Sequence, residues 1–297
     1  MICANALTMM STDFGTLAVL RLMAGLGEGQ VAALCYAAMG RSKKPSKAVA
    51  LYLAGQGLVG AVGMGVIPIL IVSVGWPWLF LGISIVALPA FWLAPSIQSL
   101  SVDTASDKNV SGAWMSWLGV YALGGVFVYF AGMSAVWAFV ERMGHAKAFS
   151  LPHLSIALSA SAVANMCGAL LVAFYAHRLR VATGLMLGVL AVLAGLSALM
   201  ISNDWKLYVA AASLFFFAWG FYYPFQFKVL ADLNRGAEMT TLLPLMTGGG
   251  LAIGPAVGGL LLSTGGTALL CSFGIACVVA STLGSLHLLS RARAPQK

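Results

Sequence analysis

Long apolar segments recur along the whole chain and are separated by short polar connections. Most are about 17 to 25 residues long, the length that an α-helix needs to cross a hydrocarbon core of about 30 Å. Lipid offers no water to backbone groups, and the runs lack the ten-residue alternation of a membrane barrel, so each run is expected to be a helix. The pattern predicts an all-α, polytopic transmembrane helix bundle with nine complete spans, at residues 16–40, 48–73, 78–94, 114–140, 152–176, 184–202, 207–230, 241–264 and 267–289.

Composition restricts the chain to the integral membrane proteins. Hydrophobic residues make up 61% of the 297 positions and charged residues only 8%, with a mean hydropathy of +0.95. Soluble domains have about 25% charged residues. A soluble protein of this size has too much surface for its volume to hide so large an apolar fraction. The lipid bilayer is therefore the first partner that the sequence predicts.

The distribution of basic residues predicts the orientation in the membrane. Eleven Lys or Arg residues lie in alternate connections, and the intervening connections hold three. Because positive residues stay on the cytoplasmic side, the C-terminus is predicted to be cytoplasmic, in an inner (plasma) membrane. The net charge of +8 is thus an orientation signal, and it gives no reason to expect a nucleic-acid partner. The connections rich in basic residues are 41–47, 95–113, 177–180, 231–240 and the C-terminal tail.

The N-terminal residues and an internal repeat predict two related halves. Residues 1–11 are apolar, but as a helix they rise only about 16 Å, and they lack the basic region and cleavage site of a signal peptide. We interpret them as the end of a span. A shift of about 194 residues aligns 54–65 with 248–259 and places Gly60 on Gly254, and paired halves are typical of secondary transporters. Extending the repeat predicts about 80 further residues before Met1.

The repeat also predicts the domain organisation. Residues 1–94 would be the remainder of an N-terminal half-bundle, with a partial span and three full spans. Residues 95–113 would be a cytoplasmic linker, and residues 114–297 a C-terminal half-bundle of six helices.

Three motifs resemble the major facilitator superfamily of twelve-span transporters. The pattern G-x-x-x-G-P-x-x-G-G occupies 250–259, where the family often has it in the eleventh span. Arg21 opens an R-x-x-x-G-x-G motif similar to that of the fourth span, and 176–180 is a degenerate copy of the G-x-x-x-D-R-x-G-R loop, with His177 in the aspartate position. The antiporter-type copy in the fifth span has Ala61 in place of proline, so the resemblance gives no support for antiport. It implies solute transport by two half-bundles.

The charged residues of span 16–40 are the first candidates for function. Glu28 lies about 20° from Arg21 around the helix and about 10.5 Å along it, so both face one way. A charge at the bilayer centre costs about 2.5 to 3.5 kcal/mol, so it faces a partner or a watery cavity. Glu28 is expected either to handle substrate or protons or to be a structural, hydrogen-bonded carboxyl. Arg21 is expected to share that role or to extend toward the outer headgroups.

Aromatic and uncharged polar residues are candidates for a substrate cavity. In span 207–230 these side chains suit the wall of a site for an apolar or aromatic solute, although such rings also pack against helices or lipid. Intramembrane amides equally serve as hydrogen bonds between helices. The cavity candidates are Trp219, Tyr222, Tyr223, Gln226, Trp137, Gln56 and Asn165.

Small residues of the repeated motif are candidates for helix packing. Gly250, Gly254 and Gly258 recur every four residues, so they form a ridge on which a neighbouring helix can lie, and Pro255 favours a bend. Gly259 belongs to the same motif, and Gly60 is the repeat partner of Gly254. The family resemblance implies that this ridge meets a helix of the other half.

The sequence contains no signature of an enzyme. The five cysteines lie in apolar spans without a C-x-x-C pair, and no phosphate-binding G-x-x-x-x-G-K-[ST] motif occurs. No catalytic residue, metal site or cofactor is predicted. The predicted function is secondary active transport of a small organic solute, coupled to protons through Glu28. The alternatives are a non-transporting receptor or assembly protein on the same architecture, and an inactive fragment of a transporter.

Overall fold

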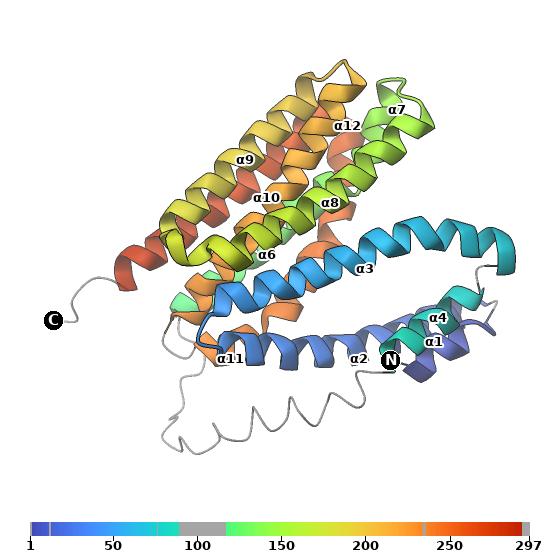
Figure 1. The fold of residues 1–297 in the computed structure, drawn as a ribbon, viewed down its shortest axis with the longest axis horizontal. Coiled ribbons are helices and arrows are strands. Elements are labelled where there is room, and N and C mark those ends of the chain that lie inside the picture. The colour runs from blue at the N-terminus through green and yellow to red at the C-terminus, as the bar shows by residue number, and fades with distance from the viewer. Residues whose placement is uncertain (1, 12, 76, 89–116, 234–235, 293–297) are drawn as a thin grey trace.

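The computed structural model describes residues 2–11, 13–75, 77–88, 117–233 and 236–292, and these residues are helical with no strand among them (Figure 1). The predicted linker 95–113 lies outside the described residues. The helices are α1 (Ile2–Thr8), α2 (Phe14–Gly40), α3 (Pro45–Val74), α4 (Pro77–Ala87), α6 (Trp117–Trp137), α7 (Val140–Ala146), α8 (Leu151–Tyr175), η1 (Ala176–Arg178), α9 (Val181–Ile201), α10 (Trp205–Ala231), α11 (Gly236–Thr241) and α12 (Leu243–Ala292).

Six helical stretches of the described residues are long and apolar enough to cross a membrane, so the predicted nine spans are not confirmed. Part of the difference lies at the predicted span 78–94, of which only α4 and one further residue are described. Another part lies in α12, where the predicted spans 241–264 and 267–289 form one 50-residue stretch that turns at Gly266. Gly266 has φ 66° and ψ −164°, a conformation that is essentially restricted to glycine.

Capping residues fix where helices begin. Asp13 precedes α2, and its Oδ2 accepts a hydrogen bond from the Thr16 amide at 2.9 Å. That bond lowers the pKa of the Asp13 carboxyl. Asp204 precedes α10 in the same way and accepts from the Leu207 amide at 3.3 Å. Both helices therefore begin where an aspartate satisfies a free amide of the first turn.

The helices α6, α8, α9, α10 and α12 pack into a unit that we call the C-terminal bundle. Its centre is α10, which contacts α8, α9 and α6. Glycines set the closest approaches, because a Cβ at Gly220 would collide with the Asn165 carbonyl and a Cβ at Gly168 with the Phe217 carbonyl. Helices α8 and α10 thus touch backbone to backbone.

The glycine ridge of α12 lies against α6. Cβ atoms at Gly250, Gly254 and Gly258 would collide with atoms of Phe127, Ala131 and Ala135 respectively. The ridge therefore packs inside the C-terminal bundle, and the expectation that it meets a helix of the other half is wrong for this arrangement. Helices α6 and α12 are neighbours over most of their length, and only small residues allow their backbones to lie so close.

The first four helices pack much more thinly on the rest of the chain. Helix α3 lies across α8 and α10 with Val49, Ala50 and Ala54 buried at its start. Helix α2 meets the C-terminal bundle and α11 mainly near its own end, where Gly40 lies against Thr240. Helices α1 and α4 lie together beside the opposite end of α2 (Figure 1). A space lined by side chains remains between α2 and the bundle.

Connections alternate between the two ends of the bundle as the charge pattern predicts. Lys43, His177 and Lys228 line one pocket, which places the α2–α3 and α8–α9 connections at the same end as the last turns of α10. At the other end Lys147 donates to the Ser202 carbonyl, which joins the α7–α8 and α9–α10 connections. The basic connections 41–47 and 177–180 thus lie at the same end.

Candidate functional site

The central cavity has a volume of about 400 Å³ and lies between α2 and α3 on one side and α6, α8, α10 and α12 on the other. We call it the central cavity because elements from both ends of the sequence enclose it. Its polar lining consists of Glu28, Tyr36, Tyr52, Gln56, Asn165 and Thr247, and its larger apolar lining residues are Leu53, Phe130, Phe216, Trp219, Pro244 and Leu251.

Small residues create the space around Glu28. Gly25, Gly29 and Ala32 line the cavity together with Glu28, at spacings of three and four residues that place them on one face of α2. The Glu28 side chain is exposed and has no hydrogen bond or ion pair within the described part of the chain. None of the described lining residues is basic. The cavity therefore holds a single carboxylate whose charge is unmatched there.

Two amides, one from α3 and one from α8, also line the cavity. Gln56 donates from Nε2 to the Tyr52 hydroxyl at 2.9 Å, and Asn165 donates from Nδ2 to the Phe216 carbonyl at 3.0 Å. Each amide is held by one bond, and its carbonyl oxygen makes none among the described residues. Both oxygens can accept hydrogen bonds from a bound solute. The structure thus brings Glu28, Gln56 and Asn165 together, as candidates from three different helices.

Trp219 lines the cavity on the side of α8 and α10, as Asn165 does. Its ring lies edge-on to Phe216 and Phe130, with centroids 5.3 and 5.8 Å away. Tyr36 and Tyr52 form a similar edge-on pair on the opposite side, with centroids 5.6 Å apart. Aromatic rings therefore flank the carboxylate on both sides of the cavity.

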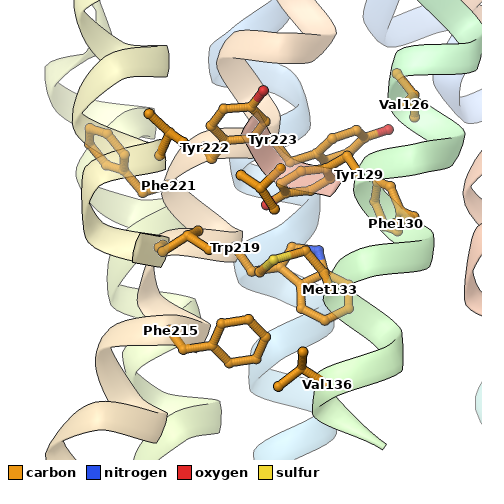
Figure 2. Close-up of a cluster of buried hydrophobic side chains, with 14 of the residues drawn as sticks. Val126, Tyr129, Phe130, Met133, Val136, Phe215, Trp219, Phe221, Tyr222 and Tyr223 are labelled. Atoms are coloured by element: carbon orange, nitrogen blue, oxygen red, sulfur yellow. The ribbon is translucent and has the colours of Figure 1, made fainter. Parts of the chain in front are cut away.

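The other candidates of α10 lie in the packed interior, away from the cavity wall. Tyr222 and Tyr223 are fully buried and Gln226 is 2% exposed. Tyr222 stacks on Tyr129 with centroids 4.6 Å apart (Figure 2). The Tyr222 hydroxyl lies 3.0 Å from Thr282 Oγ1. Gln226 donates from Nε2 to Ser281 Oγ at 2.7 Å. Because helices surround α10 on most sides, these polar groups are buried, and they join α10 to α12 by hydrogen bonds.

The remaining predicted residues do not line the central cavity. Trp137, at the end of α6, stacks on Phe216 with centroids 3.8 Å apart. Gly259 faces Phe139, and no atom lies within 4 Å of a Cβ placed at Gly60. Pro255 sits inside α12, within the ridge that contacts α6. Among the described residues no group of His, Cys, Asp and Glu could hold a metal ion.

Arg21 lies outside the cavity and joins three helices. Its Nη2 donates to Asn5 Oδ1 at 2.7 Å and to Thr8 Oγ1 at 2.6 Å, both in α1. Its guanidinium also lies 4.6 Å from the centroid of Phe80, in α4. Although Arg21 and Glu28 face similar directions on α2, Arg21 contacts α1 and α4 whereas Glu28 lines the central cavity. Arg21 holds α1 and α4 against α2.

Sequence analysis missed several residues of these two sites. Tyr52 lies four positions before Gln56, so helical spacing alone could have placed it on the same wall. Thr247 precedes three glycines, which was a weaker signal. Asn5 and Thr8 stand three residues apart in an otherwise apolar stretch, and that spacing could have shown a polar face on α1.

Comparison with known proteins agrees with this arrangement. The profile of the Major Facilitator Superfamily matches residues 1–233. Among solved structures, the chain is similar to the crystal structure of FucP, a transporter of this superfamily in the outward conformation, with a TM-score of 0.67 and 14% identity. That similarity covers 97% of this chain and 79% of FucP. No curated protein sequence matches the chain significantly.

The match covers more than three quarters of the sequence, and the helical fold agrees with it. Apolar helices, a cavity between two groups of helices and the family profile all indicate a multi-pass membrane protein of a transporter family. The chain belongs to the Major Facilitator Superfamily.

Proposed function

We propose that the chain is a secondary active transporter that moves a small organic solute through the central cavity by alternating access. The observation that carries this proposal is the unmatched Glu28 carboxylate in a 400 Å³ cavity between two groups of helices. A cavity of that size suits a small organic molecule. The two groups would be the halves 1–94 and 114–297, joined by residues 95–113.

The arrangement of α2 supports alternating access. Near the end of α2, Gly40 contacts Thr240 and the Tyr36 ring lies 5.9 Å from that of Phe227, so the two groups meet there. Farther from that end the cavity separates them. We assign the end with the basic connections to the cytoplasm of an inner membrane, because positive residues accumulate there. The described state would then be closed to the cytoplasm, as expected for a relative of an outward-facing transporter.

The cavity lining favours a solute with a positive charge and an apolar part. Glu28 attracts a cation, and the described lining residues contain no base to compete for it. Aromatic rings attract cations through their faces and also bury apolar groups. The free oxygens of Gln56 and Asn165 would accept hydrogen bonds from an ammonium or hydroxyl group. The same carboxylate can bind a proton, so we propose that Glu28 couples solute movement to protons.

Glu28→Gln tests this proposal because it keeps the side chain's size and removes its charge. The 297-residue chain is reconstituted in vesicles, and uptake of organic cations is followed with and without a pH gradient. We expect the variant to lose about tenfold or more of the gradient-driven flux, the effect of losing one hydrogen bond to a charged group. Glu141→Gln is the matched control, because Glu141 is an exposed carboxylate of α7 outside the cavity.

The outcomes separate the alternatives. Saturable flux that responds equally to the pH gradient in the wild type and in Glu28→Gln would leave Glu28 a structural role. If only neutral solutes give saturable flux, the proposal that the substrate is a cation is wrong, whereas the proposal that the protein is a transporter stands. The absence of saturable flux for every solute would favour a receptor, an assembly protein or an inactive fragment on this fold.

A further inference from the structure

A second pocket, of about 440 Å³, lies at the end of the protein that carries the basic connections. We call it the basic pocket. Lys43, Lys44 and Lys47 enter it from the α2–α3 connection and the first turn of α3. His177 enters from η1 and Lys228 from the last turn of α10. Transport through the central cavity uses none of these residues.

The charges of the basic pocket are not balanced by the protein. Lys228 pairs with Asp232, with Nζ 2.8 and 2.9 Å from the two carboxylate oxygens. Lys43, Lys44 and Lys47 have no carboxylate within 4.0 Å among the described residues. Like charges collected in one concave site repel each other unless an anion lies between them. The pocket therefore selects a negatively charged ligand.

Uncharged donors also point to an anion. Ser46 is only 8% exposed, it lines the pocket, and its hydroxyl makes no hydrogen bond within the described residues. Helix α3 begins at Pro45, so the amides of its first turn have no partners inside the helix, and its dipole is positive there. A buried hydroxyl, free amides and lysines together match the oxygens of a phosphate group.

Much of the rest of the lining is apolar. Phe174, Leu179, Val181 and Phe225 line the pocket, and Phe174 is 58% exposed. These residues belong to or border the spanning helices α8, α9 and α10. A soluble anion would leave this apolar surface uncovered, whereas a lipid would place its acyl chains on it. The geometry points to the phosphate headgroup of an anionic phospholipid as the ligand.

Such a lipid would bridge two parts of the protein. Three lysines come from the α2–α3 region, and His177 and Lys228 come from the C-terminal bundle. Basic pockets between spanning helices are a recognised way of holding anionic headgroups. This site does not depend on the proposed transport, since binding of the lipid can be measured without any solute.

The test compares two double variants of the purified chain. Lys43→Gln with Lys47→Gln removes two charges from the pocket, and Arg142→Gln with Lys206→Gln removes two from the opposite end. Binding is measured with nanodiscs or vesicles of phosphatidylcholine containing phosphatidylglycerol, and by mass spectrometry of retained lipid. We expect the pocket variant to bind phosphatidylglycerol about thirtyfold more weakly, from the usual contribution of two lysines near a lipid headgroup. The control variant should bind as the wild type does.

Phe174→Gln distinguishes a lipid from a soluble anion. It should weaken binding of phosphatidylglycerol and leave binding of inorganic phosphate unchanged, because only the acyl chains contact the ring. An equal loss in both double variants would show general surface attraction and overturn the proposal. The pocket would instead be assigned to a soluble anion if two results were found together. Inorganic phosphate would bind saturably and displace the lipid, and Phe174→Gln would change neither the phosphate affinity nor the lipid affinity. Melting temperatures of all variants serve to confirm that each is folded.

Discussion

Helices α2 and α10 have the same length and the same kind of start, yet their surroundings differ strongly. Each has 27 residues and follows a capping aspartate. Three residues of α2 are buried, against sixteen of α10. In α10 most of the large aromatic residues pack in the interior, whereas in α2 glycines lie on both sides of Glu28 along the cavity. The comparison teaches that, in this protein, runs of bulky aromatic residues indicate a packed interior, and small residues beside a charged one indicate the candidate site.

The comparison extends to the closely packed C-terminal bundle and the thinly packed first helices, and placing the same bulky residue in each should break it most clearly. Gly254→Leu would press on Ser134, Ala131 and Ala135 of α6, whereas Gly60, its repeat partner in α3, has no atom within 4 Å of an added Cβ. We expect Gly254→Leu to destabilise the fold by about 3 kcal/mol or more, because a close-packed interface cannot absorb the side chain. Gly60→Leu should change stability by about 0.5 kcal/mol or less.

Chemical unfolding in detergent, followed by circular dichroism and tryptophan fluorescence, measures both variants. Equal stability of Gly254→Leu and the wild type would show that α6 and α12 are farther apart than described. A large loss for Gly60→Leu would show instead that α3 is covered on its exposed face.

Removing one hydroxyl from the C-terminal bundle and one from the cavity side of α3 should give a smaller difference. Tyr222→Phe removes the buried contact with Thr282, which should cost about 1 kcal/mol, the usual net value of one hydrogen bond. Tyr52→Phe removes the acceptor of Gln56, but the exposed Gln56 amide can bond to water in the cavity. We therefore expect Tyr52→Phe to leave the free energy of unfolding nearly unchanged, and a larger loss for Tyr52→Phe than for Tyr222→Phe would reverse the comparison.

The smallest global effect should come from Arg21. Arg21→Leu removes both hydrogen bonds to α1, so the amides of residues 2–8 should exchange with deuterium about tenfold faster. Global stability should change little, because α1 does not contact the C-terminal bundle extensively. Lys206→Gln, at the start of α10, is the control. Unchanged exchange in α1 would mean that other contacts hold this helix.

The sequence predicted where helices begin and end better than it predicted which helices pack against each other. Hydropathy placed α2 within two residues, at 16–40 against Phe14–Gly40, because a lipid-crossing helix needs a long apolar run whatever it contacts. The facing of α10 could not be predicted in the same way. Its apolar residues surround the helix, so no periodicity separates the side at Trp219, on the cavity, from the side at Tyr222, in the interior.

Partners that lie far away in the sequence were the least predictable part of the site. Glu28 was found because a charge in an apolar run is conspicuous and costly. The contacts of Arg21 with Asn5 and Thr8 depend on how α1 folds back on α2, and those of the glycine ridge depend on which helix lies beside α12. Local patterns show that a surface must be covered, and only the tertiary arrangement shows by what.

The reciprocal glycine contact between α8 and α10 has a consequence for the proposed binding of a solute. Gly168 touches the backbone of α10 at Phe217, and Gly220 touches the backbone of α8 at Asn165. No side chain lies in these contacts that could change its rotamer and absorb a displacement. Asn165 itself faces the central cavity and donates to the Phe216 carbonyl. If a solute in the central cavity binds as proposed, a displacement of Asn165 would move α8 and α10 together as one rigid unit.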